Sequence, residues 1–357
     1  MSEIKDFVEI SKYAGERFDL VQAAGGNSSV KFYDKGEMLI KASGFLLSDV
    51  SKDNGYSRVL TAAVSSIVRN KEIISSVNKR DRESITSRCL KEATIDIENR
   101  PSIETLLHSL LLKYTLHTHS IVVNMIVSQG SWRETLNTIF NYDEIAFVKY
   151  ETPGIELAVA LDDELKRFVE IPNIIFLQNH GLIITSNNKD DIKNLTEYVL
   201  VKIEKYLNID MSRFKLTSSI SHLFSSIGED SNISYLSEDM FLNQHLKINK
   251  ILFSKAPFCP DTLVYCGVNT AIIKNLHDLE NILAYQIKHH ELPKIIIYNE
   301  NIIFRAPSIK KAKEIEEVLK FHIMVLLQNK DNQLKFLESE ELIYLSNWEA
   351  EKYRQKL

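Results

Sequence analysis

The stretch KYTLHTHSIVV, residues 113–123, places His117 and His119 two positions apart beside an apolar run. Side chains at positions i and i+2 of a β-strand point to the same face, so a strand here presents two imidazoles side by side. A catalytic zinc typically has three protein ligands and one open position. The pattern therefore predicts a strand that carries part of a metal site, and the mainly apolar residues 119–127 are predicted to extend it.

His180 is the best candidate for a third ligand. It lies in NIIFLQNHGLIIT, residues 173–185, where two short apolar runs flank Asn179-His180-Gly181. This pattern predicts two strands joined by a turn, with Gly181 supplying a positive φ. Taken singly, His180 is more simply a turn residue, and the HxH pair is more simply a polar part of a half-exposed strand. The three histidines together favour a metal site.

A carboxylate precedes the HxH motif. Arg100-Pro101-Ser102 stands before a predicted helix with apolar residues up to Leu111, and Glu104 lies in its first turn, where the helix dipole stabilises negative charge. Because this helix leads directly into the predicted strand, Glu104 is a candidate general base beside the metal. A helix-terminal role is the simpler interpretation for Glu104 alone, and His108 is interpreted as a packing or outer-layer histidine.

A glycine-rich segment opens the chain's first hairpin. AAGGNSSVKFYDKGEMLIKASGF, residues 23–45, predicts two short strands joined at Lys35-Gly36. Backbone N–H groups and small side chains in GGNSS and at Ser43-Gly44 are the components of an anion cradle, although a plain turn is the simpler interpretation. The spacing is not that of a P-loop or a dinucleotide fingerprint, so no nucleotide site is predicted. Lys31 and Lys41 are interpreted as strand-face or anion-pairing residues.

Length and composition indicate two folded domains. A chain of 357 residues exceeds the ~250–300 residues at which single cores usually stop growing. We place the boundary in the serine-rich stretch 212–232, which divides the chain into domains of residues 1–215 and 216–357. Apolar residues make up 44% and charged residues 25%, as in ordinary soluble proteins. The net charge of -5 offers no overall attraction for nucleic acid.

The remaining signals concern location and helices. Cys89, Cys259 and Cys266 form no CxxC pair, which favours a reducing compartment, and we expect a cytoplasmic protein. Neither a signal peptide nor ~18 consecutive apolar residues is present, so we expect neither secretion nor a membrane span. Helices are predicted over residues 3–17, 57–67, 85–97, 152–165 and 190–207, and a small α/β unit is predicted after residue 232.

Five motifs in order, GGNSSVK, IKASG, RPSIE, HTH and NHG, resemble the class II aldolase/adducin family over residues 1 to about 215. The resemblance implies that His117, His119 and His180 bind a divalent metal, usually Zn2+, with Mn2+ or Co2+ as alternatives. It implies that Glu104 is the catalytic acid/base. It also implies an αβα sandwich with a central, mostly antiparallel sheet, followed here by a smaller C-terminal α/β domain.

The resemblance further implies a substrate site, with one departure. The positions that match the phosphate-binding residues of the sugar-phosphate aldolases are Asn27, Ser43, Gly44 and Ser102. The family's common second serine before the glutamate is Ile103 here, so one hydroxyl is missing. No motif identifies the family's proton-donating tyrosine, for which Tyr142 and Tyr150 lie in a suitable region.

The implied activity is metal-dependent aldol cleavage or formation of a sugar or sugar phosphate through an enediolate. Decarboxylation or epimerisation of a hydroxy or keto sugar acid uses a similar intermediate and is the first alternative. A non-catalytic, adducin-like interaction module is the second, which the retained histidines and glutamate disfavour. The family generally forms rings of four, so we expect a homo-oligomer, with a tetramer as the family's form.

The C-terminal part carries a second resemblance. APFCPDTLVYCG, PKIIIYNENIIFRAPSIKKAKE and NWEAEKYRQKL are similar to the stretch that joins aldolase and dehydrogenase in long rhamnulose-phosphate aldolase/dehydrogenase fusions. The glycine-rich turn of those proteins reads Tyr298-Asn299-Glu300-Asn301 here. These 357 residues contain no GxGxxG fingerprint, so the resemblance implies no oxidoreductase activity, and the role of this domain stays open.

Overall fold

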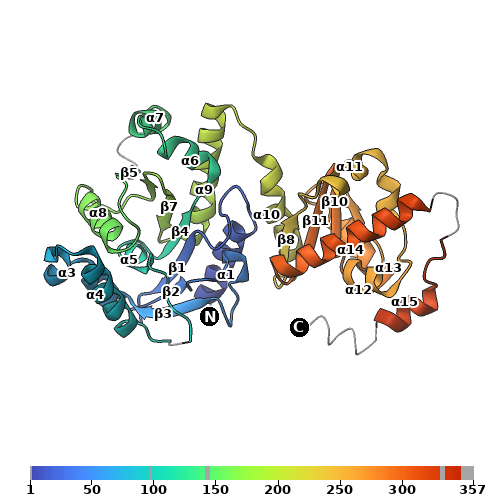
Figure 1. The fold of residues 1–357 in the computed structure, drawn as a ribbon, viewed down its shortest axis with the longest axis horizontal. Helices are drawn as coiled ribbons and strands as arrows, with labels where there is room; N and C mark the ends of the chain where they lie inside the picture. The colour runs from blue at the N-terminus through green and yellow to red at the C-terminus, as the bar shows by residue number, and fades with distance from the viewer. Residues whose placement is uncertain (1, 97, 141–144, 330–333, 347–357) are drawn as a thin grey trace. The chain divides into compact units, whose positions relative to one another are not determined.

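The computed structural model describes residues 2–96, 98–140, 145–329 and 334–346 (Figure 1). The chain divides into two compact units, Met1–Arg213 and Phe214–Leu357. Each unit has its own β-sheet and its own hydrophobic cores. No helix in the described part of the chain is long and apolar enough to cross a membrane.

The first unit is built on a seven-stranded sheet with the order β3-β2-β1-β4-β7-β6-β5. The strands are β1 (Asn27–Phe32), β2 (Glu37–Lys41), β3 (Tyr56–Leu60), β4 (Tyr114–Thr118), β5 (Ile145–Val148), β6 (Ile174–Leu177) and β7 (Gly181–Ser186). Only β5 and β6 pair in parallel, and the other neighbours are antiparallel. The predicted, mostly antiparallel sheet is therefore confirmed.

Helices cover both faces of this sheet, because side chains of successive strand residues point to opposite faces. Val30 and Leu39 belong to one core, and Met38 and Ile40 to the other. The helices that contribute to the first core are α1 (Ser2–Gly15), α6 (Ile121–Val127), α7 (Trp132–Ile139) and α9 (Lys189–Leu207). Those of the second core are α2 (Thr61–Val68), α3 (Lys71–Ser75), α4 (Lys79–Glu92), α5 (Thr105–Ser109) and α8 (Ile155–Leu165). This arrangement confirms the predicted αβα sandwich.

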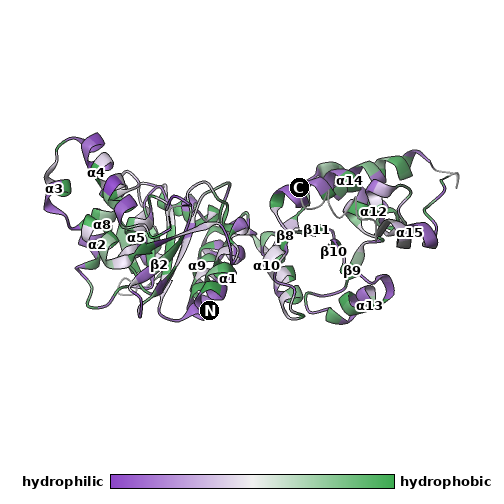
Figure 2. Ribbon diagram, turned by 90° about the horizontal axis from the view of Figure 1, so that it is seen from below, coloured by the Kyte–Doolittle hydropathy of each residue, from purple (hydrophilic) through white to green (hydrophobic). Residues whose placement is uncertain are grey.

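The second unit contains a four-stranded sheet with the order β8-β11-β10-β9. Its strands are β8 (Ile233–Leu236), β9 (Ala271–Ile273), β10 (Ile295–Tyr298) and β11 (Asn301–Ala306), with β9 and β10 parallel. The helices around it are α10 (Ser212–Ser225), α11 (Met240–Ile248), α12 (Pro260–Cys266), α13 (Leu279–His289), α14 (Ile309–Gln328) and α15 (Ser339–Ser346). Figure 2 shows hydrophobic and hydrophilic residues interspersed along α13 and α14, as expected for helices with one buried face.

Two stretches were assigned the wrong element from the sequence. Residues 121–127 form helix α6 and do not extend the strand, which ends at Thr118. A short apolar run fits a buried helix as well as a strand, and the buried residues Val122, Val123, Ile126 and Val127 follow helical spacing. Residues 56–60 form β3, paired with β2, and only the residues from Thr61 onward are helical.

Two further predictions require smaller corrections. The helix predicted at 85–97 is α4, which begins at Lys79, because the side chain of Asn78 accepts a hydrogen bond from the Arg80 N–H and caps it, and which already ends at Glu92. The serine-rich stretch predicted as a linker begins with helix α10. Serines there bond to carbonyls of the preceding turn, as Ser219 does to Lys215, so their polarity does not interrupt the helix.

The helix predicted to follow Ser102, with Glu104 in its first turn, is shorter: α5 covers only Thr105–Ser109, Glu104 is its N-cap residue, and Pro101 forms a β-bridge with Ala42. The predicted hairpin at 23–45 and the helices predicted at 3–17, 152–165 and 190–207 are confirmed.

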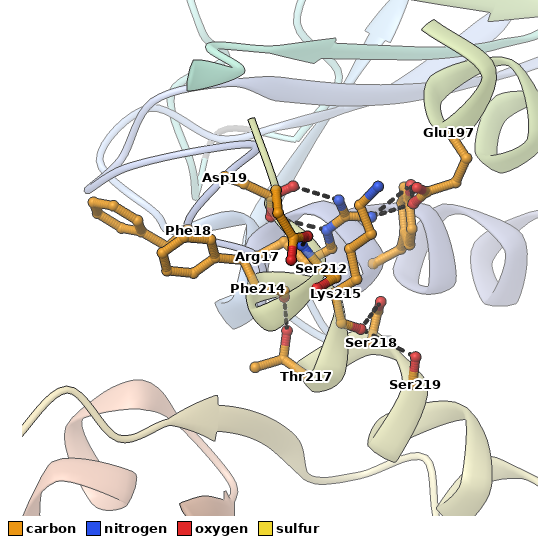
Figure 3. A network of polar contacts seen from close by, with 12 residues as sticks. Arg17, Phe18, Asp19, Glu197, Ser212, Phe214, Lys215, Thr217, Ser218 and Ser219 are labelled. Carbon is orange, nitrogen blue, oxygen red and sulfur yellow. Dashed lines mark hydrogen bonds and ion pairs between the residues drawn. The ribbon is translucent and has the colours of Figure 1, made fainter. Parts of the chain in front are cut away.

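A buried ionic network fixes the segment that leads into β1 (Figure 3). The guanidinium of Arg17 contacts the carboxylates of Asp19 and Glu197, and the Tyr13 hydroxyl donates to Glu197 at 2.6 Å. A fully buried arginine requires such partners. The backbone carbonyl of Asp19 accepts from the Ile121 N–H at 2.9 Å. The network therefore holds the start of α6 in place, directly after the HxH motif.

Candidate metal centre

His117 comes from the centre of the sheet. It lies in β4, opposite Asn27 of β1 and Ile183 of β7. Its Nδ1 lies 3.1 Å from the Leu182 carbonyl and donates to it, which leaves the lone pair on Nε2. His119 lies just beyond the end of β4, so the two histidines are not a same-face pair within one strand. The turn of the chain at this point nevertheless brings their Nε2 atoms to 3.1 Å.

His180 reaches the same point from the turn between β6 and β7. Its Nε2 lies 3.3 Å from that of His117. The positive φ of this turn, 53°, belongs to Asn179 and not to Gly181, which corrects the sequence prediction. Glycine is required at 181 for another reason: a Cβ there would lie 2.1 Å from the Thr118 carbonyl oxygen. Gly181 thus permits the close approach of β7 to β4 that places His180 beside His117.

Glu104, the N-cap residue of α5, completes the cluster. Its Oε1 lies 3.4 Å from His117 Nε2 and 3.1 Å from His180 Nε2. Its Oε2 accepts a hydrogen bond of 2.6 Å from Asn27 Nδ2. The ligand atoms of Glu104 and the three histidines all lie within 4.8 Å of one another. The structure thus gathers the four residues that the sequence singled out for chemistry.

Burial and mutual charge set the ionisation of this cluster. Burial alone would raise the pKa of Glu104, but His117 and His180 hold that pKa well below its usual range. Glu104 is therefore a carboxylate at neutral pH. Burial, together with the neighbouring His117 and His180, lowers the pKa of His119 to about 4. His119 therefore offers a neutral imidazole nitrogen at physiological pH.

The donor set fits a divalent cation. Imidazole nitrogens with a carboxylate oxygen suit zinc and similar transition metals. A tetrahedral ion with metal–nitrogen bonds of about 2.0–2.1 Å needs nitrogens about 3.4 Å apart. The Nε2 separations of 3.1 and 3.3 Å are close to that spacing. The buried Oδ1 of Asn27 has no hydrogen-bond partner among the described residues, so an acceptor beside Glu104 is also left for a ligand or water.

Two residues support the histidines without joining the cluster. Asn124 of α6 donates from Nδ2 to the His180 carbonyl at 3.2 Å and to the Ser120 carbonyl at 3.1 Å. Gly25 lies against the His119 ring, where an added Cβ would be 2.8 Å from Nδ1. Sequence reasoning missed Asn124 because it assigned that stretch to a strand. The sequence pattern around Gly25 predicted only an anion cradle and no contact with His119.

The residues predicted to bind substrate phosphate lie beside Glu104 to different degrees. Ser102 Oγ accepts from Asn27 Nδ2 at 3.0 Å and from the Glu104 N–H at 3.3 Å. Ser43 is joined to this segment through its N–H, which donates to the Arg100 carbonyl at 2.8 Å. Gly44 follows with a φ of 85°. Asn27 and Ser102 therefore contact the catalytic candidate directly, whereas Ser43 and Gly44 border the same segment, and phosphate binding stays a prediction.

Polar side chains of β1 hold α5, the helix that follows Glu104, in position. Ser29 Oγ lies 2.7 Å from His108 Nδ1, and Lys31 Nζ donates to the carbonyls of Ser109, at 3.1 Å, and of Leu111. Burial lowers the pKa of His108 to about 3 and that of Lys31 to about 7. His108 is thus a packing residue with a buried polar partner, as predicted for it.

Lys41 and the candidate tyrosines also have defined places. Lys41 Nζ donates to the carbonyls of Ala24, at 3.2 Å, and Phe45, at 2.8 Å. The exposed Tyr150 lies next to the turn that carries His180, since its N–H donates to Gln178 Oε1 at 3.2 Å. Tyr142 lies outside the described residues. The structure therefore does not select a proton-donating tyrosine.

Comparisons with known proteins agree with this fold. Residues 5–206 match the family described as Class II Aldolase and Adducin N-terminal domain. No curated protein matches the chain. The N-terminal class II aldolase domain of a conserved protein from Thermoplasma acidophilum is 21% identical, with a TM-score of 0.50 over 57% of this chain and 93% of that one.

Two other solved structures are similar over a comparable share of the chain. YgbL of Klebsiella pneumoniae, named as a candidate aldolase/epimerase/decarboxylase, is 18% identical over 58% of this chain and 89% of that one, with a TM-score of 0.41. The L-fuculose-1-phosphate aldolase of Thermus thermophilus is 16% identical over 57% and 92%, with a TM-score of 0.36. The match to the family model covers more than half of the sequence. On that basis the chain belongs to the class II aldolase and adducin N-terminal domain family.

Proposed function

We propose that this chain is a metal-dependent aldolase, a lyase that cleaves or forms a carbon–carbon bond of a sugar or sugar phosphate through an enediolate. The observation that carries the proposal is the convergence of the Glu104 carboxylate with three imidazole Nε2 atoms. All four residues belong to the unit Met1–Arg213. We place the activity in that unit and assign none to residues 216–357.

The proposed metal ligands are His117, His119 and His180, and zinc is the ion that this donor set favours, with manganese or cobalt as alternatives. When bound, such an ion supplies positive charge that stabilises negative charge on a substrate oxygen. The protein prepares the ligands: the Leu182 carbonyl sets the tautomer of His117, and Asn124 holds the turn of His180.

Glu104 is the proposed acid/base. Its Oε2 is held by Asn27, so Oε1 is the oxygen that faces the histidines. In the direction of bond formation, this carboxylate takes the proton from the carbon next to the substrate carbonyl. In the direction of cleavage, it returns that proton to the same carbon. Its lowered pKa keeps it in the basic form at neutral pH, and its burial limits competing exchange with water.

The alternatives differ in what happens around the same intermediate. Decarboxylation or epimerisation of a sugar acid would use the same ligands and the same carboxylate, and only the substrate distinguishes them. A non-catalytic, adducin-like module has no need for a buried carboxylate with a lowered pKa, and purified protein without bound metal would favour it. We also propose a homo-oligomer, and light scattering of a tetramer would give four times the chain mass of 41.0 kDa.

The test is proton exchange in D2O. Zinc-loaded protein is incubated with dihydroxyacetone phosphate, dihydroxyacetone, glycolaldehyde or pyruvate, and loss of the α-proton is followed by NMR. We expect exchange with one donor, and a loss of about 10²–10⁴-fold in Glu104→Gln, the usual contribution of a general base. Exchange in His117→Ala should also be lost.

Metal content is measured in every sample of this experiment. No exchange with any donor, in protein that holds metal, would contradict the aldolase and move the proposal to decarboxylation or epimerisation. Exchange that persists in Glu104→Gln would remove Glu104 from its role as the base.

A further inference from the structure

One face of β1 carries polar side chains at every second position. Asn27, Ser29 and Lys31 alternate along the strand, so their side chains point to the same face of the sheet. All three residues are buried. Ser29 pairs with Ile40, which belongs to the core that α5 joins, so this is the face that α5 covers. The surface of β1 beneath α5 is therefore polar, although it lies in the interior.

Two of these side chains hold the beginning and the middle of α5. Asn27 Nδ2 donates to Glu104 Oε2 at 2.6 Å, at the N-cap of the helix. Ser29 Oγ lies 2.7 Å from Nδ1 of His108, one turn further along. The buried Nε2 of His108 has no hydrogen-bond partner among the described residues, so the Ser29 hydroxyl is the polar partner that orients this ring.

Lys31 holds the end of the helix. Its Nζ donates to the Ser109 carbonyl at 3.1 Å and to the Leu111 carbonyl. The last carbonyls of a helix have no partners within the helix, and Lys31 supplies a donor for them. The contacts thus follow the same order along β1 and along the segment that begins with Glu104. Together they fix the position of α5 on the strand.

These polar contacts provide a precision that apolar packing does not. Burial of the Lys31 amine and the His108 imidazole costs free energy, which hydrogen bonds offset. Hydrogen bonds are directional, whereas hydrophobic contacts are not. Groups that take part in chemistry need support that holds them to within about 0.5 Å. The helix that is held in this way carries Glu104 at its N-cap.

We propose that Ser29 and Lys31 are positioning residues for Glu104: they fix α5 on β1 and thereby place the carboxylate against the histidines. For its effect on catalysis, the inference rests on the proposed function. A displacement of about 1 Å at the reacting atoms lowers a rate by about a hundredfold. Because Ser29 and Lys31 face α5, loss of either contact should lower kcat and leave KM unchanged.

The first experiment measures kcat and KM for proton exchange in the zinc-loaded full chain. We expect Ser29→Ala and Lys31→Met to lower kcat by about 10–100-fold without a change in KM. The matched controls remove comparable buried bonds. Ser11→Ala loses a contact of 2.7 Å to the opposite face of β1, and Lys294→Met loses a donor to a carbonyl of α12 at 2.5 Å. Both controls should lose thermal stability to a similar extent and keep the wild-type kcat.

The second readout needs neither metal nor turnover. In metal-free protein labelled with 15N-asparagine, the proton chemical shift of the Asn27 side-chain amide reports its hydrogen bond to Glu104. Asn27→Ala identifies the signal. We expect the signal to move toward the position of exposed asparagines in Ser29→Ala and Lys31→Met, and to stay in place in both controls.

The two readouts separate failure of this inference from failure of the proposed function. An unchanged kcat, an equal loss of kcat in the controls, or an unmoved Asn27 signal would each overturn the positioning role. No exchange by metal-loaded wild type would overturn the proposed function, and the Asn27 signal would then decide the positioning role by itself. If Lys31→Met does not fold, Ser29→Ala decides in the same way.

Discussion

The two units contain hairpins that look alike in sequence and differ in use. In the first unit, IIFL enters a turn and GLIITS leaves it; in the second, IIIY enters and NIIFRA leaves. Both turns place an asparagine at positive φ, Asn179 at 53° and Asn299 at 52°. Local preference therefore forms both hairpins by the same means.

The difference lies in one added residue and in the neighbouring strand. The first hairpin closes at the pair Leu177 and Gly181, so His180 fits into its turn. The second closes at Tyr298 and Asn301. Its turn residue Glu300 is exposed and pairs with Lys247 at 3.1 Å. His180 instead meets His117 of β4, because Gly181 lets that strand approach. The fold thus places one turn residue beside a second histidine and the other beside an exposed lysine.

The largest difference between the two hairpins is expected when the side chain in each turn is removed and zinc affinity is measured. His180→Ala should weaken zinc binding by more than about a hundredfold, beyond the loss usual for an outer-layer partner, and should abolish proton exchange. Glu300→Ala removes only an exposed ion pair and should change neither property. Zinc affinity is measured by competition with a chromogenic chelator. Equal zinc affinity of His180→Ala and wild type would exclude His180 as a ligand.

Addition of a methyl group should test the close approach of the strands. Gly181→Ala forces a Cβ against the Thr118 carbonyl and should lower the free energy of unfolding by about 3 kcal/mol, as overpacking does. Asn301→Ala, at the equivalent position of the second hairpin, should change it by less than about 1 kcal/mol. Denaturant titrations of both variants give these values. Similar small losses in both would show that β7 and β4 do not need this glycine.

Loss of Asn124 should have a smaller effect that is confined to the candidate metal centre. Asn124→Ala removes the donor to the His180 carbonyl and should weaken zinc binding by about 10–100-fold, the usual range for such partners. The matched control is Asn243→Ala on α11, where the side chain also donates to a carbonyl, that of Ser237 at 3.2 Å. That variant should bind zinc as the wild type does. An unchanged affinity in Asn124→Ala would contradict the role of Asn124.

In the second unit, we expect the buried His322 to serve in packing alone. Burial lowers the pKa of His322 from 6.5 to about 4. Between pH 6.5 and pH 4, His322 is therefore protonated in the unfolded chain and neutral in the folded unit. The free energy of unfolding is therefore unaffected by His322 above pH 6.5. It falls by about 2 kcal/mol at pH 5 and falls further toward pH 4.

Thermal unfolding measured from pH 7 to pH 4.5 tests this prediction. His322→Gln should reduce the loss of stability on acidification, whereas His277→Gln, at an exposed position, should leave it as it is in the wild type. An identical pH dependence in His322→Gln and wild type would mean that this histidine is not held neutral by the fold.

Local patterns in the sequence predicted most of the elements, and they erred where two elements share a pattern. Alternation around Lys35-Gly36 correctly predicted a hairpin, and helical spacing correctly predicted α9. The run from Ile121 to Val127 is apolar without a decisive period, so the strand assignment failed there. The order of the motifs identified the four residues of the candidate metal centre, whose chemical roles remain predictions.

The sequence by itself determined the family, the sandwich of helices and antiparallel strands, and the side chains that are candidates for metal binding and catalysis. These depend on motif identity and on periodicities within short windows. The tertiary structure decided that Asn27 donates to Glu104, 77 positions away, and that His117 meets His180, 63 positions away. Local sequence signals do not encode such distances, because strand order and register depend on packing of the whole sheet. For the same reason, the place of Ile103 against Gly154 emerged only from the fold.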